Sequence, residues 1–154
     1  MASGSSARPK VNPIPDGYHS VTPYLVVADA DLLLRFLKSA FGAQELTAHR
    51  GPEGVIHHAE AKIGDSILMM GRAGGDVKPQ SCTMQLYVPD VDAAYRTAMN
   101  AGAKSLEPPA DQFYGDRRAG VEDRCGNSWY MATHIEDVSP EEIGRRAAAL
   151  AGHT

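Results

Sequence analysis

An internal repeat divides most of this chain into two similar halves. Residues 22–31, TPYLVVADAD, align with residues 83–92, TMQLYVPDVD, at an offset of 61, and Arg35 and Arg96 continue the match. Further matches follow at offsets of 60 and 62: Gly42 and Ala43 with Gly102 and Ala103, and Gly64, Ser66 and Met69 with Gly126, Ser128 and Met131. Self-similarity of this kind indicates repeated supersecondary units that bury their apolar faces together. We therefore expect one domain over 17–134, with module one (22–71), a linker (72–82) and module two (83–134).

Each half has the pattern of one strand, one helix and three further strands. Residues 24–27 and 85–88 are rich in β-branched and aromatic side chains, and an aspartate suited to capping a helix follows each. The helix expected over 31–41 has its leucines on one stripe, and residues 44–70 predict strands joined by turns. Outside the repeat, we expect a flexible arm over 1–16 and, from the capping box that begins at Ser139, a helix and tail within 135–154.

Composition argues against several classes of protein. Fifteen basic and 19 acidic residues give a net charge of −4 without a basic cluster, so nucleic acid is not an expected partner. No apolar run approaches the roughly 20 residues needed to cross a bilayer, so no membrane span is expected. The first ten residues lack the apolar stretch of a secretory signal, which predicts a cytoplasmic protein. Cys82 and Cys125 have no CxxC spacing and are expected to be free thiols.

Seven short motifs carry a resemblance to a known superfamily: TPYLVV at 22–27, FGA at 41–43, HAE at 58–60, IGDS at 63–66, DQFYGDR at 111–117, GNSW at 126–129 and ATH at 132–134. Together with the repeat they resemble the vicinal oxygen chelate superfamily, which includes glyoxalase I, extradiol dioxygenases, fosfomycin resistance enzymes and bleomycin resistance proteins. More narrowly, the chain looks like the PhnB-like branch. The resemblance implies an α+β fold of two tandem βαβββ modules, with a cup-shaped mixed sheet, in a homodimer that has pockets near its interface.

In metal-dependent members of the superfamily, the resemblance implies four ligands that are usually His, Glu or Gln. One lies near the start of the first strand and one within the last strand of each module, and here these places hold Thr22, Leu68, Thr83 and Tyr130. None of these is a histidine or a carboxylate, and the Leu68 side chain has no electron pair to donate. We therefore expect neither the usual divalent metal nor another cofactor, and we assign neither glyoxalase nor dioxygenase chemistry.

Strand alternation predicts which side chains line the cup, because every second residue of a strand shares a face. Thr22 and Tyr24 in module one, and Thr83, Gln85 and Tyr87 in module two, are expected on the cup face. On the last strands, the offset of 62 places Leu68 over Tyr130. The three tyrosines are either part of the pocket or ordinary core aromatics with locally satisfied hydroxyls.

His58 and Glu60, two residues apart on one expected strand, are the main candidates for chemistry. Four interpretations are open: the two residues form an acid–base couple, they are two ligands of an unusual metal site, they contact a bound ligand, or they belong to a solvated polar strand face. The offset of 62 also places Glu122 over Glu60, so that each half would contribute one acid.

The segment 111–117 combines amide, aromatic and guanidinium groups around a glycine. Gln112, Phe113, Tyr114 and Arg117 have the composition of a loop that grips a planar or anionic ligand. The alternative is a structural turn in which Asp116 pairs with Arg117 or Arg118.

These observations favour a small-molecule binding protein that works without the usual metal, as bleomycin resistance proteins sequester a drug. The alternative is a lyase or isomerase in which Glu60 or Glu122 is the proton-transfer base, His58 its partner, and Arg117 orients an anionic substrate. A third hypothesis is an atypical divalent metal held by His58, Glu60 and a neighbouring side chain.

Overall fold

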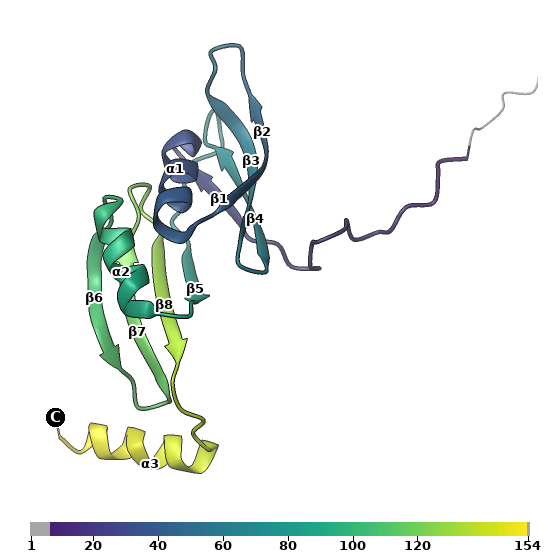
Figure 1. Ribbon diagram of the computed structural model, residues 1–154. Helices are drawn as coiled ribbons and strands as arrows, with labels where there is room; N and C mark the ends of the chain where they lie inside the picture. The colour runs from purple at the N-terminus through teal and green to yellow at the C-terminus, as the bar shows by residue number, and fades with distance from the viewer. Residues whose placement is uncertain (1–6, 154) are drawn as a thin grey trace, which may run out of the picture.

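The computed structural model describes residues 7–153 and confirms the expected α+β fold (Figure 1). In chain order the elements are β1 (Tyr24–Val27), α1 (Ala30–Phe41), β2 (Gln44–Arg50), β3 (Ile56–Ile63), β4 (Ser66–Arg72), β5 (Thr83–Tyr87), α2 (Val91–Asn100), β6 (Lys104–Asp111), β7 (Asp116–Glu122), β8 (Ser128–His134) and α3 (Pro140–Ala151).

Each module forms one four-stranded mixed sheet. Sheet one has the strand order β1-β4-β3-β2 and sheet two has the order β5-β8-β7-β6. In both sheets the first strand runs parallel to the last, and the other neighbours are antiparallel. This identical order is the structural form of the sequence repeat.

The helices begin where the sequence predicts a cap. The side chain of Asp29 accepts a hydrogen bond from the amide of Leu32, and Asp90 does the same for Ala93, so each aspartate satisfies a free amide of the first turn. α1 ends at Gly42, whose φ of 64° lies in the left-handed region that favours glycine.

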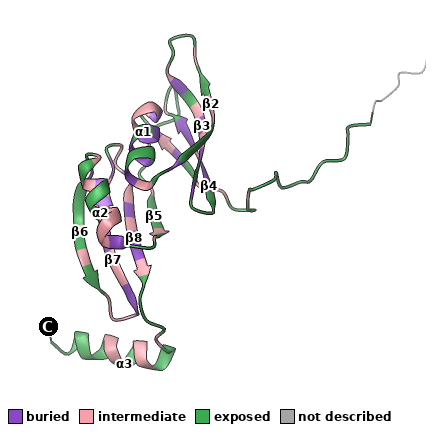
Figure 2. Cartoon of the chain, viewed as in Figure 1, coloured by how far each residue is buried: buried purple, intermediate pink, exposed green. Residues whose placement is uncertain are grey.

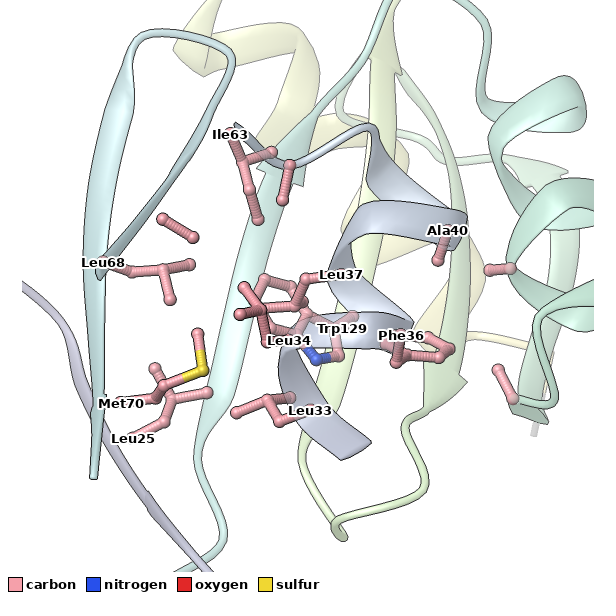
Figure 3. Close-up of a cluster of buried hydrophobic side chains, with 14 of the residues drawn as sticks. Leu25, Leu33, Leu34, Phe36, Leu37, Ala40, Ile63, Leu68, Met70 and Trp129 are labelled. Carbon is pink, nitrogen blue, oxygen red and sulfur yellow. The ribbon is translucent and has the colours of Figure 1, made fainter. Parts of the chain in front are cut away.

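The two modules share one hydrophobic core (Figure 3). α1 and α2 pack against each other, and each helix also covers one face of its own sheet. Trp129 of β8 reaches Phe41 of α1, with 5.1 Å between the ring centroids. Within residues 7–153, no helix covers the opposite face of either sheet, and we call these two surfaces the open faces.

The structure corrects the predicted face of β4. Tyr24 lies opposite Met69 in the parallel ladder and Gln85 lies opposite Tyr130, so Met69 is the structural counterpart of Tyr130. Leu68 is only 5% exposed and packs into the core beneath α1 (Figure 3). The prediction that Leu68 lines the cup is therefore wrong, because an alignment error of one residue exchanges the two faces of a strand.

The proposed equivalence of Glu60 and Glu122 is also wrong. Glu60 lies opposite Met69, whereas the residue opposite Tyr130 is Gly120, and Glu122 lies opposite Ser128. Glu60 and Gly120 are therefore counterparts, and only module one carries a carboxylate at this position.

The segments outside the two modules lie apart from the core (Figure 2). Residues 7–17 run away from the body with exposed side chains, and residues 1–6 of the predicted arm lie outside the described residues. α3 lies beyond the ends of β6 and β7 and has no buried residue. None of the helices within residues 7–153 is long and apolar enough to cross a membrane.

Candidate functional site

Three polar side chains form a hydrogen-bonded row on the open face of sheet one. The hydroxyl of Tyr24 lies 3.2 Å from Nδ1 of His58, and Nε2 of His58 lies 3.3 Å from Oε1 of Glu60. Tyr24 reaches His58 by leaning over Gly71, where an added Cβ atom would lie 2.5 Å from the phenol oxygen. The structure thus brings together three of the residues predicted for the site.

Tyr18 completes this row, although no pattern in the sequence predicted its place there. Its hydroxyl donates to Oε2 of Glu60 from the segment before β1. This bond is the main reason that the pKa of Glu60 is lowered, with His58 adding to the effect, and it raises the pKa of Tyr18 to about 12. A tyrosine outside the repeat gave no periodic signal that could have marked it.

The ionised Glu60 determines the tautomer of His58. A carboxylate only accepts hydrogen bonds, so Nε2 carries the proton that points to Glu60. In the neutral imidazole, Nδ1 then accepts from the Tyr24 hydroxyl. When His58 is protonated, Nδ1 becomes a donor and the Tyr24 hydrogen is free for a ligand. The row therefore couples the charge of His58 to the hydrogen-bond direction of an exposed phenol.

A surface cavity of about 610 Å³ adjoins this row at the Tyr24 end. Its wall comes from the turn between β2 and β3, the start of β3, the end of β4 and the segment after β4, and it includes Glu53, His57 and Arg72. This volume lies within the range of small-molecule sites.

A second polar group lies on sheet two. Asp116 is only 5% exposed, and its two carboxylate oxygens contact the Tyr87 hydroxyl at 2.8 Å and Nδ1 of His134 at 2.8 Å. Nε2 of His134 lies 2.7 Å from Asp137. The pKa of His134 is raised, first by Asp137 and then by Asp116. The structural-turn alternative required Asp116 to pair with Arg117 or Arg118. Asp116 pairs with neither arginine, so this alternative is wrong.

Gln85 and Tyr87 also line a cavity of about 430 Å³ between the two modules. Its other wall includes Phe41 and the turn that joins β3 to β4. Leu86, from the other face of β5, lines the same cavity, so the cavity lies at the edge of this strand and does not test the predicted cup face.

Arg117 does not lie on the open face. Its guanidinium binds Asp92 at the start of α2 through two hydrogen bonds of 2.7 and 3.0 Å and binds Asp111 at 2.9 Å. The prediction that Arg117 orients a ligand in the cup is corrected, because alternation along β7 turns this side chain to the helix-covered side. Arg118 takes the position on the open face.

The remaining predicted residues are spread over the surface. Phe113 lines a separate cavity of about 470 Å³ beside α3, and Tyr114 packs edge-on against Phe113. Gln112 bonds the carbonyl of Ala110, and the Thr22 hydroxyl bonds the carbonyl of His19. Thr83 begins β5 and lies opposite Ser128. The structure does not gather these residues around one point.

The positions that correspond to the superfamily's metal ligands do not form a suitable donor set. With the register corrected, they hold Thr22, Met69, Thr83 and Tyr130, and a thioether, a phenol and two alcohols are poor ligands for a divalent metal. Across residues 7–153, no three His, Cys, Asp or Glu side chains converge closely enough to hold an ion. We derive no chemistry through a metal.

Comparison with known proteins agrees with this architecture. The family model of the glyoxalase/bleomycin resistance protein/dioxygenase superfamily matches residues 17–131. The chain belongs to this superfamily. The uncharacterized protein Mb0911c of Mycobacterium bovis is 34% identical over 139 residues, which cover 80% of this chain and 89% of that protein.

Solved structures have the same fold. TioX from Micromonospora sp. ML1 is 27% identical with a TM-score of 0.66, and the match covers 74% of this chain and 97% of TioX. A glyoxalase/bleomycin resistance protein/dioxygenase from Nocardioides is 20% identical with a TM-score of 0.59, and the match covers 79% of this chain and 87% of the Nocardioides chain. The second likeness supports the fold alone.

Proposed function

We propose that this protein binds a small organic molecule on the open faces of its sheets, without the usual divalent metal of the superfamily. The observation that supports this best is the exposure of fixed aromatic groups on both faces. Tyr24 is 49% exposed and Tyr87 is 62% exposed, yet each hydroxyl has a hydrogen-bond partner on its own sheet. Exposed aromatic rings that are already positioned lose little conformational entropy when they bind a ligand.

The proposal includes a homodimer. Within one chain the modules pack through α1 and α2, so the open faces lie on the far sides of their sheets from the helices. Sheet one of one copy facing sheet two of another would enclose the ligand and would cover exposed apolar side chains. The narrower likeness to the PhnB-like branch and a cytoplasmic location also belong to this proposal.

A complementation experiment tests the binding site and the dimer together. A thermal-shift screen of aromatic compounds and antibiotics first identifies a ligand, because a bound ligand stabilises the folded state. Tyr24→Ala and Tyr87→Ala are then expected to abolish binding as homodimers. A purified heterodimer of the two variants should regain about half of the wild-type sites, because one of its two cups has both tyrosines. A heterodimer without binding would exclude a cup shared between copies.

The row from Tyr18 to Tyr24 favours a second function, a lyase or isomerase that moves a proton. Here His58 exchanges the proton through Tyr24, and Glu60 orients His58. Glu60→Gln is expected to reduce turnover of a substrate by about 100-fold while its affinity changes little. If wild-type protein shows no turnover and Glu60→Gln loses binding, the enzyme hypothesis is excluded.

An atypical metal held by His58 and Glu60 is tested by elemental analysis of protein purified without an affinity tag or added metal. A transition metal at one equivalent per two chains or more would support this site. Contents well below that level would exclude it.

A further inference from the structure

The turn between β7 and β8 is longer than its counterpart in module one. The five residues 123–127 join β7 to β8, whereas only two, Gly64 and Asp65, join β3 to β4. Module one forms the same sheet with the short turn, so the three extra residues are not needed to complete a module. They reach module one instead, where Sγ of Cys125 lies 3.5 Å from the carbonyl oxygen of Asp29, the residue that caps α1.

Buried hydrogen bonds fix the conformation of this turn. The Asp123 carboxylate accepts from the amides of Cys125 and Asn127 and from the Asn127 side chain. Arg124 is exposed, and its stem lies over the backbone just after α2, since an added Cβ atom at Gly102 would lie 3.1 Å from Cδ of Arg124. Gly102 has a φ of 99°, so a glycine both permits this backbone and leaves room for the stem. The turn and Gly102 together direct Arg124.

Arg124 lines a surface cavity of about 210 Å³ where the turn meets the two helices. Arg35 and Ser39 line the same cavity from α1. They lie one helical turn apart, so their side chains project from the same side of the helix. The apolar part of the wall comes from Leu32, Phe36 and Ala101. Two guanidinium groups and one hydroxyl, contributed by both modules, therefore adjoin one cavity.

The fold neutralises neither of these two arginines. Within residues 7–153, the guanidinium groups of Arg35 and Arg124 make no ion pair and no hydrogen bond. Asp29, Asp31 and Asp123 lie on the segments that form the cavity, but each already accepts a hydrogen bond from a backbone amide. Two positive charges at one cavity repel each other, and an anion bound between them would remove that repulsion.

The size and the donors of this cavity indicate a small oxyanion. Its volume of about 210 Å³ is below the roughly 300 Å³ at which sites for whole organic molecules begin. Guanidinium groups bind phosphate oxygens through paired hydrogen bonds, and two of them match the charge of a dianion. The donors come from α1 and from the β7–β8 turn, which suits a tetrahedral group better than a planar carboxylate. The chain's net charge of −4 provides no general attraction for anions.

We propose that Arg35, Arg124 and Ser39 bind a phosphate group in this cavity. The open faces lie on the far sides of the sheets from α1 and α2, so this site is separate from the proposed small-molecule site (Figure 1). Bound phosphate joins a helix of module one to a turn of module two and should stabilise the contact between the modules. Inorganic phosphate and the phosphoryl group of a larger molecule share this chemistry.

Inorganic phosphate is the first probe. Thermal unfolding in phosphate is compared with unfolding in chloride at the same ionic strength, because a bound ligand stabilises the folded state. We expect a higher Tm in phosphate, with an effect that saturates as its concentration rises. Isothermal titration calorimetry then measures Kd. Arg35→Gln and Arg124→Gln should each weaken phosphate binding by at least about ten-fold, because each removes a charge-assisted hydrogen bond.

Arg96→Gln is the matched control. Arg96 is the repeat counterpart of Arg35 on α2, is also exposed, and does not line the cavity. The substitution changes the net charge by the same amount, so phosphate affinity should stay unchanged. An equal loss of affinity in Arg96→Gln and Arg35→Gln would reveal a general charge effect and would overturn the proposed site.

Phenyl phosphate distinguishes the two sources of the phosphate group. Binding as tight as that of inorganic phosphate, or tighter, would identify the phosphoryl group of a larger molecule, and weaker binding would identify the free ion. The inference is overturned if phosphate and chloride give the same Tm, or if phosphate affinity survives both Arg35→Gln and Arg124→Gln.

Discussion

Tyr18 donates a hydrogen bond to Glu60, 42 residues further along the chain, and so ties the segment before β1 to the middle of β3. This contact is the first cause of the lowered pKa of Glu60 and of the raised pKa of Tyr18, about 12. Because the same carboxylate orients His58, Tyr18 controls the whole row without lying in the sheet.

We expect Tyr18→Phe to raise the pKa of Glu60, since the variant removes the donor that most favours the charged form. A lowered carboxyl pKa contributes stability above the unfolded pKa and loses it as pH falls through the folded value. The variant should therefore lose stability at pH 7 and little at pH 3. Carbon-detected NMR titration of Glu60 measures the shift. Tyr95→Phe, which removes an exposed bond to Ser105, should leave the titration of Glu60 unchanged.

Leu68→Ala and Met69→Ala test the corrected register of β4. Leu68 is buried in the core, so its truncation should lower the free energy of unfolding by about 2–5 kcal/mol. Met69 lies on the open face and is only partly buried, so Met69→Ala should cost about 1 kcal/mol or less. Chemical denaturation measures both. The reverse order of costs would restore the original prediction.

Asp123 is expected to be the most sensitive polar residue of module two. It is 4% exposed and accepts hydrogen bonds from the amides of Cys125 and Asn127, the Asn127 side chain and the Trp129 indole. Asp123→Ala leaves these buried donors without an acceptor and should cost about 3 kcal/mol of unfolding free energy. The comparison is Asp65→Ala in the corresponding exposed turn of module one, where we expect about 0.5 kcal/mol or less. Similar losses in the two variants would contradict this account.

The contact of His134 with Asp116 and Asp137 should depend on pH. The pKa of His134 is raised, so the ion pairs are complete below the unfolded pKa of about 6.5 and are lost as pH rises through the higher folded value. NMR titration of the His134 ring should give a pKa above 6.5. Asp137→Asn removes the largest cause of the shift and should lower this value. A titration unaffected by Asp137→Asn would rule out the pairing in solution.

The sequence repeat was sufficient to predict the strand-helix-strand order and the two modules, and seven short motifs carried the resemblance to the superfamily. These features depend on local patterns, such as the caps at Asp29 and Asp90 and the stop at Gly42, and on a period that is readable without coordinates. Strand alternation likewise placed His58 and Glu60 on one face of their strand, since residues near in sequence keep their phase.

Only the tertiary structure decided which side chains meet. An offset of 62 instead of 61 was enough to exchange Leu68 for Met69, and the composition of 111–117 gave no sign that Arg117 would turn to α2 while Arg118 turned to the open face. The hydrogen bond of Tyr18 with Glu60 joins segments that are distant in the sequence, and so does the contact of Asp116 with His134. No local pattern encodes either of them. The physical reason is that strand register and loop path follow from how the whole core packs, and a shift of one residue reverses every side chain.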